Sequence, residues 1–97
     1  MVISLTKSQV TGEQAQRVEE FLHGLLPRMQ RQPGVVAIYH YHDAGRGEST
    51  TAVIWESDEA RQAYRQSELI KEAIAFEQKL GLASTREAYP LAYASTR

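Results

Sequence analysis

Residues 35–55 read VVAIYHYHDAGRGESTTAVIW, and this stretch decides the fold class. β-branched and aromatic residues dominate both of its halves, which suits two pleated strands over 35–42 and 49–55. The segment between them, 43–47, contains two glycines that can adopt positive φ, as a tight hairpin loop requires. The sequence therefore predicts an antiparallel pair of strands in the middle of the chain.

The residues before this pair predict a strand followed by a helix. Residues 2–6 read VISLT, a short β-branched run that is typical of a strand. Thr11 and Gln14 have the spacing of a capping box, which marks a helix start. Apolar residues then recur at steps of three and four as far as Met29, so we expect a helix with one apolar stripe. Pro27 lies inside that stretch and is expected to kink it.

The residues after the pair predict two further helices and a last strand. Ser57 precedes two acidic residues, an arrangement typical of a helix N-terminus, and a short helix over 58–66 is expected. Ser67 begins a second helix that ends at Gly81. The last strand is expected over 85–93. A proline inside it favours an edge position, because proline has no N–H for the ladder.

The order of these elements is strand, helix, two strands, helical segment, strand. This is the split pattern of an α+β, ferredoxin-like antiparallel sheet with helices on one face, in which the spatial order of strands is fourth, first, third, second. The second and fourth strands are then open edges, and the other face of the sheet has no helix to cover it. We therefore expect a homodimer that buries this face.

Composition limits the classes of function. The chain has 97 residues, 42% hydrophobic and 24% charged, which predicts a single domain over 1–97. A net charge of -1 provides no positive field for nucleic acid or anionic lipid, so neither partner is expected. The absence of cysteine excludes disulfides and thiolate metal sites. We expect a soluble, cytoplasmic protein, without a signal peptide or a membrane span.

The faces of the central hairpin depend on its register, and we predict that His42 pairs with Glu48. One face of the hairpin then carries Tyr39, Tyr41, Thr51, Val53 and Trp55. The other face carries Val36, Ile38, Ala52 and Ile54. Because the second set is wholly apolar, we expect it under the helices, with the first set on the uncovered side.

An aromatic wall with a few polar groups is typical of a pocket for a flat aromatic molecule. On this reading the dimer encloses the pocket, and the partner is a small aromatic molecule. The alternative is that the aromatic residues only pack in the dimer interface.

Two kinds of polar residue carry possible chemistry. His40 and His42 alternate along one strand and share a face, but a metal site would need a further donor, and no metal site is predicted. Either histidine could instead remove a phenolic proton, although the predicted register turns both away from the aromatic pocket. Arg61 and Arg65 lie four residues apart and could hold an anionic group or solvate a helix face.

Three segments carry a family resemblance. They are the pair Pro33-Gly34, the tract IWESDEA over 54–60 and the pair Ser67-Glu68. In order and spacing they resemble the antibiotic biosynthesis monooxygenase family, whose members are small dimeric α+β barrel proteins. The resemblance implies a cofactor-independent monooxygenase that oxidises a small aromatic, phenolic or quinol substrate with O₂, without flavin or metal.

The resemblance also suggests roles for individual residues. Trp55 would be a pocket wall, and Thr51 falls where some members have a hydrogen-bonding asparagine. We expect the substrate-binding residues to be Trp55, Tyr39, Tyr41, Thr51 and Tyr64, with Tyr64 closing the pocket.

Some positions depart from the family pattern. Arg61 falls where some members have a tyrosine, and Ile70 where quinol-oxidising members have a histidine. Ile74 occupies the place of the iron ligand of haem-degrading relatives, and isoleucine cannot coordinate iron. The isoleucine at position 70 favours the alternative function, which is a catalytically inactive dimeric module that binds a ligand or acts in a stress response.

Overall fold

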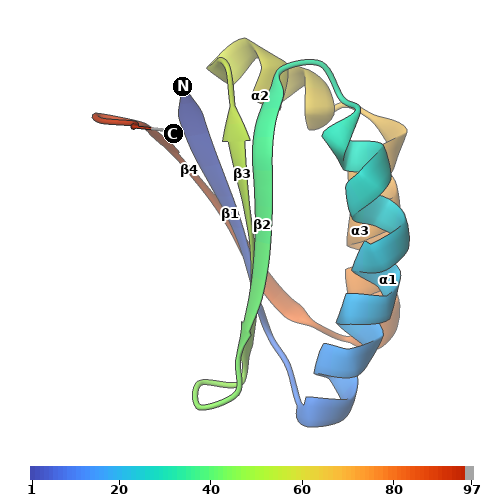
Figure 1. Cartoon of the computed structure of the whole chain (residues 1–97). Coiled ribbons are helices and arrows are strands. Elements are labelled where there is room, and N and C mark those ends of the chain that lie inside the picture. Colours follow the sequence, from blue (N-terminus) through green and yellow to red (C-terminus); the bar gives the residue numbers. More distant parts are fainter. Residues whose placement is uncertain (96–97) are drawn as a thin grey trace.

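The structure, a computed structural model, describes residues 1–95. One four-stranded antiparallel sheet has the spatial order β2-β3-β1-β4. Its strands are β1 (Val2–Gln9), β2 (Val35–Asp43), β3 (Glu48–Trp55) and β4 (Ala83–Pro90). Three helices, α1 (Gly12–Gln30), α2 (Asp58–Tyr64) and α3 (Glu68–Leu80), lie on one face of the sheet (Figure 1). The predicted α+β ferredoxin-like fold and strand order are confirmed.

The helix starts follow the predicted capping signals. The hydroxyl of Thr11 accepts the backbone N–H of Gln14 at 3.2 Å, and the side chain of Gln14 accepts the N–H of Thr11 at 3.0 Å. The hydroxyls of Ser57 and Ser67 accept the backbone N–H groups of Ala60 and Ile70 at the starts of α2 and α3, and Gly81 ends α3 with φ of 70°. α1 continues through its internal proline to Gln30. These ends depend on local backbone chemistry, which explains why they could be predicted.

The predicted register of the hairpin is wrong by one residue. Asp43 pairs with Glu48, and His42 pairs with Ser49. The turn is closed by the side chain of Asp43, whose Oδ1 accepts the backbone N–H of Arg46 at 3.1 Å, so Asp43 belongs to the strand end and not to a five-residue loop. The shift changes which residues of β2 and β3 share a face.

The corrected faces separate the residues that were expected together. Val53 and Trp55 are 2% and 0% exposed and pack beneath the helices with Leu25 and Ile70. Because side chains alternate along a strand, Thr51 faces the helices too. Tyr39 and Tyr41 pair with Ala52 and Thr50, so they lie on the opposite face. Ile38, opposite Val53, is the only member of the predicted helix-side set that does face the helices; Ala52 and Ile54 do not.

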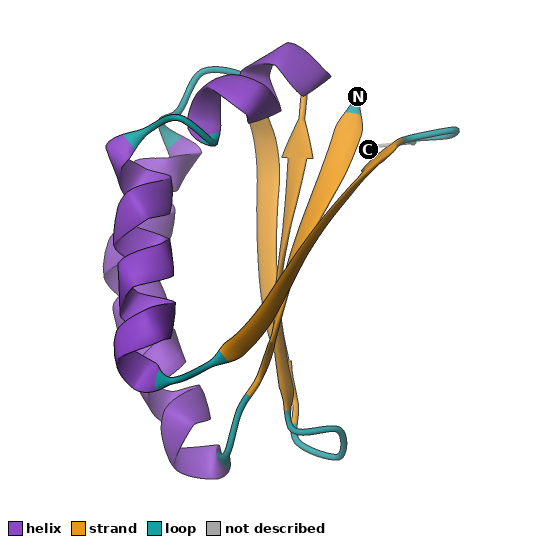
Figure 2. Ribbon diagram, turned by 180° about the vertical axis from the view of Figure 1, so that it is seen from behind, coloured by secondary structure: helices purple, strands orange, loops and turns teal. Residues whose placement is uncertain are grey.

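Within the described part of the chain no helix covers that second face, as the view from behind also shows (Figure 2). It exposes three tyrosines, Tyr39, Tyr41 and Tyr89, by 64, 53 and 50%. Ile3 and Leu5 of β1 lie between them, opposite Ile54 and Ala52. The part of the uncovered face around Ile3 and Leu5 is therefore mainly apolar and aromatic.

Gly34 and Ala60 join the start of β2 to the start of α2. Gly34 has φ of 85°, and a Cβ atom on it would lie 2.4 Å from the Cβ of Ala60. Its carbonyl also accepts the N–H of Glu56 at 2.7 Å. Two of the three sequence segments noted above, 33–34 and 54–60, thus lie in close contact. Only glycine at position 34 permits this approach.

None of the helices among residues 1–95 combines the length and the apolar character that a bilayer crossing demands.

Candidate functional site

A cavity of about 130 Å³ lies between the sheet and the helices. It is bounded by β1, β3, β2 and β4 on one side and by α1, α2 and α3 on the other. We call the sheet side the floor and the side formed by α1 and α3 the roof.

The polar part of the floor consists of small hydroxyl side chains and one histidine, beside the apolar side chains of Val53 and Ala88. The polar residues are Ser4, Thr6, Ser8, Ser49, Thr51 and His40. Paired strand positions place them on one face, with Thr6 opposite Thr51 and Ser8 opposite Ser49. A face that packs under helices is ordinarily filled by large apolar side chains, and side chains as small as serine leave space there. The cavity is a direct consequence of these residues.

The roof is apolar except for Glu77 of α3, which lies at one end of the cavity. Its apolar residues are Val18, Phe21, Leu22, Leu25, Leu26 and Met29 from α1 with Ile70 and Ala73 from α3. Apolar walls with a few convergent polar groups are the usual composition of a small-molecule site. A flat ring could pack against the roof while its polar substituents meet the hydroxyls of the floor.

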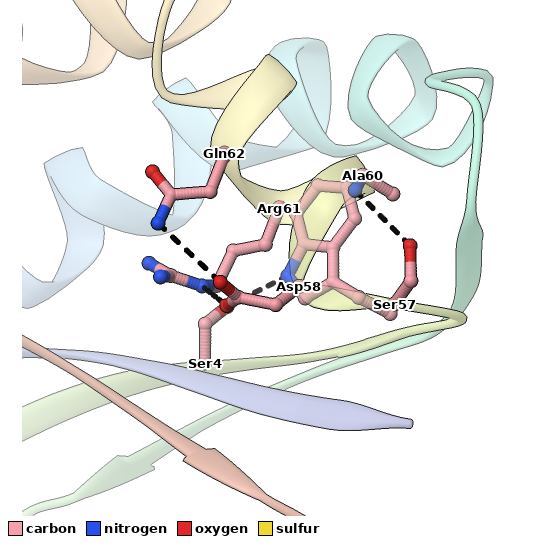
Figure 3. A network of polar contacts seen from close by, with 7 residues as sticks. Ser4, Ser57, Asp58, Ala60, Arg61 and Gln62 are labelled. Carbon is pink, nitrogen blue, oxygen red and sulfur yellow. Dashed lines mark hydrogen bonds and ion pairs between the residues drawn. The ribbon is translucent and has the colours of Figure 1, made fainter.

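Charged side chains close the end of the cavity nearest β4 and α2. Arg86 donates two hydrogen bonds to the carboxylate of Glu77, at 2.9 and 2.5 Å, and both side chains are mostly buried. Arg61 donates from Nε to Asp58 at 2.8 Å (Figure 3), which holds the pKa of Asp58 below its usual value. Arg65 completes this group. The end is rich in fixed hydrogen-bond donors.

Trp55 lies behind the lining of the cavity and supports it. Its indole Nε1–H donates to the Oγ of Ser4 at 3.0 Å, and its ring centroid is 5.4 Å from that of Tyr64. Ser4 and Tyr64 both line the cavity. Burial raises the pKa of Tyr64, so its phenol is neutral at ordinary pH. Trp55 thus positions two lining residues.

His40 is the floor residue that sequence reasoning placed away from the pocket. Its Nδ1 and the Oγ1 of Thr51 share a hydrogen bond of 3.0 Å, while its Nε2 is buried without a hydrogen-bond partner among residues 1–95. Burial lowers the pKa of His40 below its ordinary value of 6.5. A neutral imidazole therefore lies in the wall of the cavity.

The structure brings only part of the predicted site together. Thr51 and Tyr64 line the cavity, and Trp55 is immediately behind it. Tyr39 and Tyr41 are on the other face of the sheet and do not reach this cavity. The predicted common face for Trp55, Thr51 and the two tyrosines was wrong because of the one-residue register error. The signal that would have located the site is the period-two run of hydroxyls in β1 and β3.

Metal ligands are not clustered here. Residues 1–95 contain no group of three or more His, Cys, Asp or Glu side chains that could hold a metal ion.

Comparison with known proteins decides the family. Residues 1–75 match the family described as antibiotic biosynthesis monooxygenase. The chain belongs to this family. No curated protein sequence matches the chain at significant similarity.

Several solved structures have the same fold as this chain. A candidate antibiotic biosynthesis monooxygenase from Deinococcus radiodurans superposes with a TM-score of 0.87 at 18% identity, over 100% of this chain and 98% of that one. SnoaB, a cofactor-independent oxygenase from Streptomyces nogalater, gives 0.76 at 20% identity, over 96% and 94%. Rv0793 from Mycobacterium tuberculosis gives 0.72 at 18%, over 97% and 98%. At these identities the likeness establishes the fold.

Within this family framework, Thr51 and Trp55 lie on the helix-facing side of β3. Ile70, the position where the resemblance leads us to look for a histidine, lines the roof, and Ile74 is 36% exposed on α3. The family-related positions 51 and 70 therefore both border the cavity.

Proposed function

We propose that the protein is a cofactor-independent monooxygenase that oxidises a single-ring phenol or hydroquinone with O₂. One observation carries the proposal. The cavity of this monooxygenase-family chain has a mainly apolar roof over a floor whose polar groups are hydroxyls and one neutral imidazole. This composition suits a flat electron-rich ring with one or two hydroxyl groups. SnoaB, which shares the fold, is a cofactor-independent oxygenase.

The size of the cavity supports a single ring. A volume of about 130 Å³ is close to that of apolar protein cavities of about 150 Å³ that bind one benzene ring. Pockets that enclose drug-sized ligands are larger, roughly 300–1,000 Å³. A substrate of three or four fused rings would require the roof to move.

The reaction balances without an external reductant. A phenol and O₂ give a quinone and water, and a hydroquinone and O₂ give a hydroxyquinone and water, since one oxygen atom enters the ring and the other leaves as water. The ring provides the four electrons that O₂ accepts. The protein's part is to bind the ring, exclude bulk water and favour the phenolate, which is easier to oxidise than the phenol.

We propose that the working unit is a homodimer joined through the uncovered sheet face. The three half-exposed tyrosines, Tyr39, Tyr41 and Tyr89, surround Ile3 and Leu5 on this face. Apolar and aromatic surface of this kind is typical of an interface between subunits. Sedimentation of wild-type protein and of Tyr39→Glu at micromolar concentration tests this. A folded monomeric wild-type protein would contradict it.

The oxygenase proposal is tested by O₂ uptake with hydroquinone, methylhydroquinone and anthrone as probes. We expect uptake above a heat-denatured control with the single-ring probes and none with anthrone. Binding of the probes without uptake would instead indicate the inactive ligand-binding module.

A pair of variants on α3 tests the location of the site. Ala73 is buried in the roof, and Ala75 is exposed on the same helix. Ala73→Leu puts three carbon atoms into the cavity and is expected to weaken probe binding at least tenfold, which is about 1.4 kcal/mol. Ala75→Leu should bind the probes like wild type. Equal affinities for the two variants would place the ligand elsewhere.

A further inference from the structure

His40 has a different environment at each ring nitrogen. Nδ1 shares a hydrogen bond of 3.0 Å with the hydroxyl of Thr51, its partner across the β2–β3 ladder. Nε2 is buried and has no hydrogen-bond partner among residues 1–95. When the ring carries its proton on Nδ1, it donates to Thr51 and keeps a lone pair on Nε2. A buried acceptor of this kind is costly unless some donor meets it.

The other titratable groups of the lining are poorly suited to accept a proton. The carboxylate of Glu77 is occupied by both terminal nitrogens of Arg86. The carboxylate of Glu87 accepts the hydroxyl of Tyr89 on the uncovered face. Tyr64 is a neutral phenol whose pKa is raised by burial. His40 is therefore the lining group whose chemistry fits a base near neutral pH.

Burial is the main reason why His40 is unprotonated. It lowers the pKa of His40, the charge of Glu19 on α1 and the backbone of Thr50 on β3 raise that pKa, and His42 on the same strand lowers it. The net direction is down. The ring is then available as a proton acceptor at neutral pH, where a histidine in water would be partly charged.

We propose that His40 is the general base of this site and that its Nε2 accepts the proton of the substrate's phenolic hydroxyl. The inference rests on the proposed function for the identity of the substrate. In this step the phenolic O–H bond breaks, an N–H bond forms at Nε2, and the electron pair stays on the phenolate oxygen. Thr51 is a positioning residue that keeps Nδ1 engaged while the imidazolium exists. The proton then goes to the water formed from O₂.

His40 is part of the cavity lining, and Nε2 is its ring nitrogen without a partner among residues 1–95. Because Nε2 is buried in the ligand-free structure, the lining around it has to shift before a substrate hydroxyl can reach it. Hydrogen bonds of catalytic bases are often unformed in ligand-free structures and form only when substrate is bound.

His42 offers a matched control. It lies two residues along β2 on the same face and also shares a hydrogen bond with a hydroxyl, from Nδ1 to the Oγ of Ser49 at 3.3 Å. Unlike His40 it is not part of the cavity lining. His42→Gln therefore repeats the loss of a histidine on this strand and leaves the proposed base intact.

The test measures kcat/KM for O₂ uptake with methylhydroquinone as a function of pH. His40→Gln is expected to lower kcat/KM by about 100-fold or more, in the range of general-base catalysis, and to remove the acid limb of the profile. His42→Gln should keep kcat/KM near the wild-type value and should retain an acid limb, which moves to higher pH because His42 no longer lowers the pKa of His40. Thr51→Val should lower kcat more than it raises KM and should move the acid limb. The proposal would be overturned if His40→Gln and His42→Gln lowered kcat/KM equally and the acid limb of the pH profile persisted in His40→Gln.

A binding measurement separates the base from the oxygenase. 4-Nitrophenol is a single-ring phenol whose visible absorbance reports its ionisation. Bound to wild type or His42→Gln, it is expected to ionise about 1 pH unit lower than when bound to His40→Gln, because an adjacent proton acceptor or opposite charge lowers the pKa of a phenol. If this shift is present without any O₂ uptake, the base stands and the oxygenase proposal fails. Absence of a shift that depends on His40 overturns the base. Should His40→Gln fail to fold, Thr51→Val takes its place. If bound 4-nitrophenol ionises at the same pH in Thr51→Val as in wild type, the proposal that His40 is the base is overturned.

Discussion

The indole of Trp55 donates its N–H to the hydroxyl of Ser4 across the β1–β3 ladder, at 3.0 Å. Trp55 is completely buried, so this donor has no access to water. The bond ties the largest core side chain to the first hydroxyl of the cavity floor. Core packing and the shape of the site therefore depend on the same pair of residues.

Ser4→Ala is expected to destabilise the protein by about 1–3 kcal/mol, because it leaves a buried indole N–H without an acceptor. Urea unfolding followed by circular dichroism measures the loss. In a Trp55→Phe background the same serine substitution should cost much less, since no donor remains to be satisfied. A cost that is equal in both backgrounds would show that the hydrogen bond contributes nothing.

Gly34→Ala is expected to be more destabilising than Gly81→Ala. Both glycines have positive φ, 85° and 70°, and an alanine at either one costs about 1–2 kcal/mol for the left-handed backbone. Only at Gly34 does the new Cβ also collide with Ala60, at 2.4 Å, whereas the space at Gly81 is open. Thermal unfolding compares the two variants. Ala60→Gly combined with Gly34→Ala should recover the collision part of the loss, and failure to recover any would contradict the contact.

Glu77→Gln is expected to cost about 1–3 kcal/mol, because Arg86 is then left mostly buried without its full charge partner. The side chains of this pair are only 21 and 15% exposed. Glu72→Gln breaks a pair of the same bidentate geometry with Arg28, but those side chains are 48 and 45% exposed, and under 1 kcal/mol is expected. Similar losses for the two variants in urea unfolding would mean that burial does not strengthen the inner pair.

The pH dependence of stability should report the environment of His40. Its pKa is lowered by burial, so the unfolded chain binds a proton more readily than the native protein. The native state therefore loses stability as pH falls from 6.5, the ordinary pKa, toward the lower native pKa. Above pH 6.5 the ring is neutral in both states, and the protein keeps its full stability with respect to this group. We expect the melting temperature of wild type to fall more between pH 7 and 5 than that of His40→Gln, by calorimetry. Parallel curves would show that His40 titrates normally.

The sequence by itself determined the elements of this fold and their order. The helix ends depend on hydrogen bonds or backbone angles within a few residues, so the local sequence predicts them. They are marked by Thr11 with Gln14, by Ser57, by Ser67 and by Gly81. The β-branched run over 35–55 likewise identified the hairpin, and the alternation of elements led to the sheet order. Short-range chemistry explains each of these successes.

Only the tertiary structure decided which residues meet. Strand side chains alternate with a period of two, so the register closed by Asp43 placed Thr51 and Trp55 under the helices beside His40 and left Tyr39 and Tyr41 outside. The sequence offered an apolar set for the helix side, but the fold placed serines and threonines there. The cavity exists because packing between layers is set by the whole sheet and its helices, and no local pattern contains that information.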